Sequence, residues 1–159
     1  MVQALLADTN VITMVIDAAH GRIKEPGRRD IADWYAAKIG GAPSVLSFAT
    51  VAELMRWVIS RRDPVDRERA GRAVGDLLGR SYVVHSNAGI LEAWATIRHE
   101  ATVRGLSQVK DVNDSQINDL WIAATALACG LTLVTHDAGF GWMAALGLDI
   151  LTCRKPAAD

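Results

Sequence analysis

Short apolar runs alternate along the chain with longer segments whose apolar residues recur at helical spacing. The short runs predict strands at residues 5–7, 44–47, 82–85, 131–135 and 148–152. The longer segments predict helices from about residue 10 to 20, 31 to 39, 51 to 58, 65 to 78, 87 to 104 and 116 to 129. Strands that alternate with helices in this way indicate an α/β protein with a mainly parallel central sheet.

The connections before the second and the fourth predicted helix carry different signals. The stretch from Arg22 to Asp30 is charged and contains Pro26 and Gly27, so we expect a loop before the second helix. The sequence assigns no function to the charged residues 20–29. Asp63 and Pro64, in contrast, form a helix-start signature, because a capping aspartate precedes a proline at the first helical position.

The composition is that of a globular protein in a reducing compartment. At 159 residues the chain can form one domain with a full core, and we expect this domain over 1–153, with a frayed tail at 154–159. The apolar runs are too short for a membrane span and no export signal begins the chain, so we expect a cytoplasmic protein. Cys129 and Cys153 lie far apart, which predicts two reduced, partly buried thiols rather than a disulfide or a zinc site.

An aspartate follows the first predicted strand. Leu5, Leu6 and Ala7 lead directly into Asp8, and apolar periodicity resumes after Thr9 and Asn10. In open α/β sheets, ligands bind beyond the carboxyl ends of the strands, so Asp8 is a candidate site residue. Asp8 could equally cap the next helix, because its carboxylate can accept bonds from free amides of the first turn. The two interpretations stay open at this stage.

A glutamate follows the second predicted strand in a similar way. Thr50 and Glu53 have the T-x-x-E spacing of a capping box, in which the glutamate bonds back to the amide of the capping residue. Glu53 would then be structural. The alternative is a functional role. Glu53 lies at the front of a helix just after a strand, so it could belong to the same site as Asp8.

Two further acids complete the candidate site. Asp119 lies in an alanine-rich helix and shares a helical face with Ala123 and Ala126, which predicts a carboxylate packed toward the sheet. A lone buried carboxylate is costly, so Asp119 should be paired, protonated or bound to a metal. Asp137 follows the fourth predicted strand, after Thr135 and His136.

Parallel strands bring their carboxyl ends to one edge of the sheet, so these four acids should meet there. Their charges would repel one another unless a divalent cation neutralises them. Oxygen ligands without histidine or cysteine favour Mg²⁺, with Mn²⁺ as a substitute. The chemistry that such a site supports is metal-assisted hydrolysis of a phosphodiester bond. The candidate residues are Asp8, Glu53, Asp119 and Asp137.

The third and fourth predicted helices have a basic bias. Seven arginines and four acids lie between Arg56 and Arg80, whereas the net charge of the whole chain is −1. The overall charge argues against nonspecific coating of nucleic acid. The local bias is typical of a solvated helical face, and it would also suit an acidic partner or an RNA backbone.

Four motifs in order resemble those of the PIN-domain ribonucleases, and in particular the VapC toxins of type II toxin–antitoxin modules. The motifs are Asp8-Thr9-Asn10, Val51-Ala52-Glu53-Leu54, Asn118 to Ala124, and Val134-Thr135-His136-Asp137. The resemblance covers nearly the whole chain. It implies a PIN-like three-layer α/β/α sandwich that acts as a Mg²⁺-dependent endoribonuclease.

The same resemblance implies roles and partners. The family's metal-binding acids fall on Asp8 and Asp119, with Glu53 and Asp137 completing the cluster. The small polar residues that shape the site fall on Thr9, Asn10 and Thr135. The implied substrate is a tRNA or rRNA, the implied partner is a VapB-like antitoxin, and the implied assembly is a homodimer. The candidate contacts to RNA or antitoxin are Arg56, Arg61 and Arg62.

One departure from the family pattern affects the number of metal ions. Many relatives have a further acid before the phenylalanine of the last motif, whereas here Asp137 is followed by Ala138, Gly139 and Phe140. The sequence is therefore compatible with one bound metal ion or with two. Other functions also remain open: a PIN nuclease of RNA processing outside a toxin–antitoxin pair, or a non-catalytic acidic-pocket domain. A phosphatase of the haloacid-dehalogenase type is disfavoured, because Asn10 replaces the second acid of its DxD motif.

Overall fold

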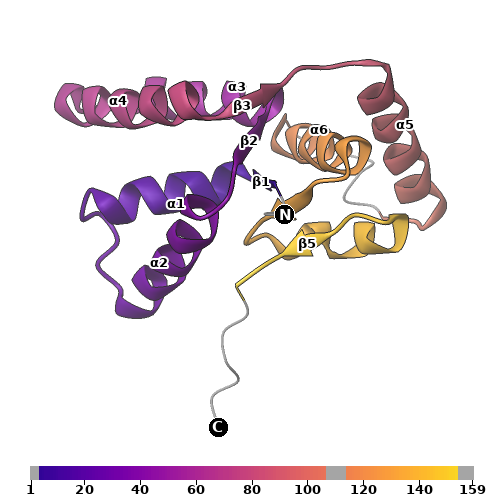
Figure 1. The fold of residues 1–159 in the computed structure, drawn as a ribbon, viewed down its shortest axis with the longest axis horizontal. Coiled ribbons are helices and arrows are strands. Elements are labelled where there is room, and N and C mark those ends of the chain that lie inside the picture. Colours follow the sequence, from indigo (N-terminus) through magenta and orange to yellow (C-terminus); the bar gives the residue numbers. More distant parts are fainter. Residues whose placement is uncertain (1–3, 107–113, 154–159) are drawn as a thin grey trace, which may run out of the picture.

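The central feature of the fold is a five-stranded parallel sheet (Figure 1). The computed structural model describes residues 4–106 and 114–153. The strands are β1 (Leu5–Ala7), β2 (Ser44–Ser47), β3 (Tyr82–Val84), β4 (Thr132–Val134) and β5 (Ile150–Leu151). Their order is β3-β2-β1-β4-β5, and each neighbouring pair is parallel. All five predicted strands are confirmed. The predicted tail, 154–159, lies outside the described residues.

Six α-helices and one 3₁₀ helix form in the described part of the chain. The α-helices are α1 (Thr9–Ala19), α2 (Pro26–Gly40), α3 (Phe48–Ile59), α4 (Pro64–Arg80), α5 (Ala88–Val103) and α6 (Asp114–Cys129). The 3₁₀ helix, η2, spans Ala138–Leu146. The predicted start of α4 is confirmed, because the Asp63 side chain accepts a hydrogen bond from the amide of Val65 and Pro64 is the first helical residue.

The predicted loop from Arg22 to Asp30 is wrong over its second half. Helix α2 begins at Pro26 rather than near Ile31. Proline fits the first turn of a helix, because its fixed φ is helical and the missing amide proton would have no partner there. The charged residues that follow Pro26 are exposed and form the outer face of this first turn.

The short connection between α1 and α2 is anchored by ion pairs. Arg22 pairs with Asp17 of α1 at 3.1 Å and also with Asp66 of α4. Arg61, just after α3, pairs with Asp17 at 2.9 Å and with Asp66 at 2.8 Å. We call these four residues the charge network. It joins α1, the end of α3 and the start of α4, which gives the charged connection a structural role.

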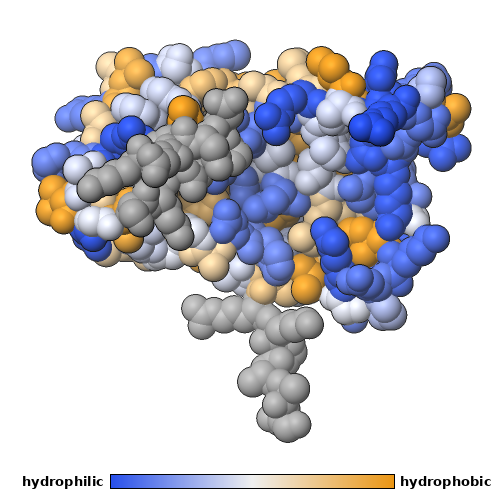
Figure 2. All heavy atoms as spheres, turned by 180° about the vertical axis from the view of Figure 1, so that it is seen from behind, coloured by the Kyte–Doolittle hydropathy of each residue, from blue (hydrophilic) through white to orange (hydrophobic). Residues whose placement is uncertain are grey.

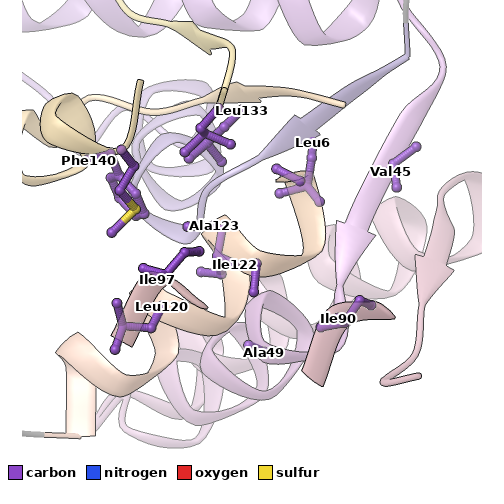
Figure 3. Close-up of a cluster of buried hydrophobic side chains, with 14 residues drawn as sticks. Leu6, Val45, Ala49, Ile90, Ile97, Leu120, Ile122, Ala123, Leu133 and Phe140 are labelled. Carbon is purple, nitrogen blue, oxygen red and sulfur yellow. The ribbon is translucent and has the colours of Figure 1, made fainter. Parts of the chain in front are cut away.

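The strands alternate their side chains between two helical layers. Leu6, Val45 and Leu133 face a core that includes residues of α5, α6 and η2 (Figure 3). Ala7, Leu46 and Val134 face the opposite side, which is packed against α1 to α4. Helices cover both faces of the sheet, so the molecule is a three-layer α/β/α sandwich, as the resemblance to PIN-domain ribonucleases implied.

The chain changes direction beside β1. From β1 it proceeds outward to β2 and β3, and it then returns through α5 and α6 to place β4 on the other side of β1. The segments that leave β1 and β4 diverge at this switch point, which is where ligands bind in open α/β sheets. Asp8 follows β1 directly, so the topology places it at this position.

None of the helices in residues 4–106 and 114–153 is long and apolar enough to cross a membrane. Both cysteines are free thiols. Cys153 is half-buried as expected, whereas Cys129 is exposed. The expectation for Cys129 was wrong because it is the last residue of α6, where the helix leaves the core.

Candidate active site

Asp8 is buried at the carboxyl end of β1, with 2% of its surface exposed. It is the first residue before α1, yet its side chain caps no amide of that helix. Its Oδ2 atom instead accepts a hydrogen bond of 2.7 Å from the hydroxyl of Thr135, at the end of β4. The capping interpretation of the Asp8 side chain is therefore wrong, and the carboxylate belongs to the edge of the sheet.

Glu53 is held by two donors from other elements. The hydroxyl of Thr9 donates to Oε2, and the side-chain amide of Asn118 donates to Oε1 at 3.2 Å. The capping box is wrong, because α3 begins one turn earlier than predicted. Ser47 is the capping residue, and its hydroxyl accepts from the amide of Ala49 at 3.2 Å. Glu53 is thus free to face α1 and α6.

Asp119 is half-buried on α6, and its pKa is raised to about 7. Burial is the main cause, and the charges of Asp8, Glu53 and Asp137 add to it. The pKa of Asp8 is likewise raised to about 6 by burial, with smaller contributions from the charges of Glu53 and Asp137. The Thr135 hydroxyl and the Thr9 amide act on Asp8 in the opposite direction. The four predicted acids therefore lie close enough to repel one another.

Asp137 is the most exposed member of this group and has a second role. Its Oδ1 atom accepts a 2.7 Å bond from the amide of Gly139 and so caps the 3₁₀ helix η2. Its own amide donates to the Thr135 hydroxyl at 3.0 Å. Thr135 thereby connects Asp137 to Asp8 through a single hydroxyl group.

An open groove of about 520 Å³ gives solvent access to this site. Asp8, Glu53 and Asp119 line it together with residues of α1 and the second half of α3. The remaining lining residues are Thr9, Asn10, Thr13, Arg56, Trp57 and Ser60. Asp137 is not part of the lining. The groove thus contains three carboxylates and one arginine.

The donor chemistry of the groove fits a hard divalent cation. Carboxylate, hydroxyl and amide oxygens are the ligands that Mg²⁺ prefers, and Mg²⁺ commonly binds one or two carboxylates and keeps several waters. Within the described ranges, no three His, Cys, Asp or Glu side chains converge closely enough to enclose a metal ion. The residues therefore suit an ion bound directly by one or two carboxylates, rather than a closed protein cage.

The three predicted supporting residues lie at the site. Thr9 bonds to Glu53 and Thr135 to Asp8, as described above. Asn10 is exposed, and its Oδ1 atom lies 3.5 Å from the amide of His136, so it spans the gap between α1 and the segment after β4. Sequence reasoning missed Asn118 as a partner of Glu53, although its position beside Asp119 in the quoted motif was a signal.

The three predicted arginine contacts differ in their surroundings. Arg56 is exposed and lines the groove, and Arg62 is exposed after α3. Arg61 is half-buried in the charge network, and its guanidinium lies 4.0 Å from the centroid of the Trp57 ring. The guanidinium of Arg61 is already bound within the protein, so of these three arginines Arg56 and Arg62 are the two that face solvent.

The fold and the site together define a three-layer α/β/α protein with an acidic groove at the switch point of a parallel sheet. The chain belongs to the PIN domain family, whose family model matches residues 5–146. The match includes all four predicted acids. No curated protein matches the sequence.

Several solved structures have the same fold, among them a member of the VapBC family of toxin–antitoxin systems. VapBC2 from Rickettsia felis, bound to a promoter DNA fragment, aligns with a TM-score of 0.70 at 20% identity, over 94% of this chain and 98% of that chain. FitAcB from Neisseria gonorrhoeae aligns with a TM-score of 0.63 at 25% identity, over 92% and 95% of the two chains. VapBC-5 from Mycobacterium tuberculosis aligns with a TM-score of 0.62 at 20% identity, over 96% and 98%.

Proposed function

We propose that this PIN domain protein is a Mg²⁺-dependent endoribonuclease that acts as a VapC-type toxin and is neutralised by a VapB-like antitoxin. The observation that supports a catalytic site most directly is the raised pKa of Asp8, to about 6, and of Asp119, to about 7. Burying acids that repel one another destabilises the free protein. Such perturbed groups in an open groove are typical of functional sites.

The roles of the four acids follow from their surroundings. Asp8 and Asp119 would hold the ion, with Glu53 and Asp137 completing the acidic cluster. When bound, Mg²⁺ or Mn²⁺ polarises a phosphoryl oxygen and lowers the pKa of a bound water. Glu53 is oriented at both oxygens by Thr9 and Asn118, and its remaining lone pairs can accept a proton from an attacking water.

The groove also offers a contact for the phosphate backbone of RNA. Arg56 lies in the same groove as the three carboxylates, so a phosphate could approach the acids while its neighbour pairs with the guanidinium. In line with the family resemblance, we propose a tRNA or rRNA loop as the class of substrate. The phosphate contact of Arg56 would position this RNA without reading its sequence.

Exposed apolar side chains on α3 and at the start of α4 support an antitoxin partner. Met55 and Ile59 lie one turn apart on α3 and are 51% and 71% exposed, and Val65 at the start of α4 is 54% exposed. We call these three residues the apolar ridge. The groove arginine Arg56 follows Met55 directly. An antitoxin segment with apolar and acidic side chains would cover the ridge and pair with Arg56. We further propose a cytoplasmic homodimer as the toxin unit.

Cleavage of total RNA by the purified protein tests the nuclease proposal. We expect cleavage with Mg²⁺, none with EDTA, and loss of at least about 100-fold in Asp8→Asn, because one oxygen ligand and one charge are removed. Asp76→Asn changes an exposed aspartate of α4 in the same way and should cleave normally. Metal-dependent cleavage retained by Asp8→Asn would refute the assignment.

Expression in a bacterial host tests the toxin proposal separately. The wild-type protein should arrest growth, and the product of a small neighbouring gene should relieve this arrest and copurify with the protein. Replacing the three ridge residues with serine should abolish copurification without affecting cleavage. Cleavage without growth arrest or a neighbouring partner would instead assign the protein to RNA processing.

A further inference from the structure

One buried tyrosine reaches the carboxylate site from outside the four motifs. Tyr35 lies on α2 and is fully buried against Val11 and Val134. Its hydroxyl lies where β4 and β5 end, and the two strands are parallel neighbours. It contacts the segments that follow both strands, Thr135–His136 and Thr152–Cys153.

The hydroxyl of Tyr35 has one proton and two lone pairs to satisfy these neighbours. It donates to the carbonyl oxygen of Thr135 at 2.9 Å and accepts from the amide of Cys153 at 2.9 Å. Nδ1 of His136 lies 3.1 Å away and Oγ1 of Thr152 lies 3.4 Å away. With its proton donated to the Thr135 carbonyl, the Tyr35 hydroxyl can accept a second hydrogen bond through its other lone pair. The donor is Nδ1 of His136 or, at the longer distance, the hydroxyl of Thr152.

Thr135 links Tyr35 to the acids. Its carbonyl is held by Tyr35, while its hydroxyl donates to Asp8 at 2.7 Å and accepts from the amide of Asp137 at 3.0 Å. The residue is fully buried, so its carbonyl has no access to bulk water in place of Tyr35. Without the Tyr35 hydroxyl, this carbonyl would lose a buried partner, which favours a shift of the backbone at Thr135.

We propose that Tyr35 is a positioning residue for the carboxylate site. Its hydroxyl fixes the segment after β4 so that the Thr135 hydroxyl stays on Asp8 and the Asp137 amide stays on Thr135. Tyr35 itself touches neither acid. The inference rests on the proposed function only where Mn²⁺ binding or cleavage is measured, because the arrangement of Thr135 and Asp8 can be read in the protein without metal.

The two tyrosines of the chain provide a matched pair of substitutions. Tyr35→Phe removes the central hydroxyl and keeps the ring in its apolar cluster. Tyr82→Phe makes the same change on the edge strand β3, where the side chain is 72% exposed. We expect Tyr35→Phe to weaken Mn²⁺ binding by about 10-fold, as is typical when a group that orients a metal ligand is lost. In Tyr35→Phe the kcat for RNA cleavage should fall while the KM for RNA stays unchanged. The Tyr82→Phe variant should match the wild type in Mn²⁺ binding and in cleavage.

A double substitution tests whether Tyr35 acts through Thr135. If it does, Tyr35→Phe should have no further effect on Mn²⁺ affinity once Thr135→Val has removed the hydroxyl that contacts Asp8. Replacing Tyr35 with 4-aminophenylalanine restores a donor at the same place, and it should recover most of the affinity. This variant also keeps the test decisive if Tyr35→Phe folds poorly.

The 13C signal of the Asp8 carboxyl group supplies a readout in metal-free protein. Tyr35→Phe should shift this signal toward its position in Thr135→Val, and Tyr82→Phe should leave it unchanged. An unchanged Asp8 signal, or additive losses of Mn²⁺ affinity in the double variant, would overturn the positioning role. A wild-type protein that fails to cleave RNA would refute the proposed function, whereas the 13C measurement on metal-free protein would still test the positioning role of Tyr35.

Discussion

The substitution Asp8→Asn should stabilise the metal-free protein while it abolishes cleavage. The folded pKa of Asp8, about 6, lies above the ordinary aspartate value of 3.8, so the folded state binds the proton more tightly than the unfolded state does. As the pH rises from 3.8 through 6, the wild-type protein therefore loses stability, and the loss is complete above that range. Asparagine has no charge and avoids this loss.

The difference in pKa, from 3.8 to about 6, sets the size of the effect. Each unit corresponds to about 1.4 kcal/mol, so ionised Asp8 costs the folded protein at most about 3 kcal/mol at pH 8. The asparagine amide must itself be satisfied in a nearly buried position, which offsets part of the gain. Its oxygen can still accept from Thr135, and its NH₂ group no longer repels Asp119. We expect a net gain of about 2 kcal/mol, or a Tm increase of about 4 to 8 °C for a domain of this size.

Thermal unfolding of both proteins in EDTA at pH 8 and at pH 4 measures this gain. The increase in Tm should be present at pH 8 and nearly absent at pH 4. At pH 4 the Asp8 carboxyl group is largely protonated in the folded state and about half protonated in the unfolded state, so little charge is left for asparagine to remove. Asp76→Asn should show neither effect. By NMR titration, the pKa of Asp119 should fall from about 7 in the Asp8→Asn protein, since the charge of Asp8 contributes to raising it. An Asp8→Asn protein that is less stable than wild type at pH 8 would refute the argument that the ionised, buried Asp8 carboxylate destabilises the folded protein.

Three further outcomes test other parts of the structure. Mg²⁺ should raise the Tm of the wild-type protein at pH 8 by several degrees and leave that of Asp8→Asn nearly unchanged, because binding to the folded state alone stabilises it. Asn118→Leu should lower kcat by about 10-fold without a large change in Tm, since it removes a donor to Glu53; normal cleavage would place Glu53 outside the reaction. Arg61→Ala should lower the free energy of unfolding in urea by about 1 to 3 kcal/mol, because it breaks the charge network, and Arg62→Ala should not; equal losses would argue against the network.

The parts of the site that the sequence predicted are those with local signals. A short apolar run that ends in an acid marks the end of a buried strand, and this pattern located Asp8 and Asp137. Asp119 was found because a carboxylate on an alanine-rich helical face is unusual. The five strands followed from the same runs, and a parallel sheet followed from the helices between them.

The errors arose where two local signals competed. Thr50 and Glu53 have capping-box spacing, but Ser47 caps α3 first because the helix begins directly after β2. Pro26 and Gly27 are typical of turns, yet proline is equally suited to the first turn of a helix, and α2 begins there. Tyr35 had no signal at all. Its hydrogen bond to Thr135 joins residues that are 100 positions apart in the sequence.

The donors that hold the acids explain why the site can be rigid and still repulsive. Thr135 fixes Asp8, while Thr9 and Asn118 fix Glu53, and all three donors are neutral. In the described part of the chain, the ion pairs involve other acids, so no lysine or arginine bridges to Asp8, Glu53, Asp119 or Asp137. A bridging cation would have lowered the pKa values and competed for the same oxygens. Neutral donors set the geometry and leave the negative charge uncompensated, which is the condition under which a bound divalent cation stabilises the site most.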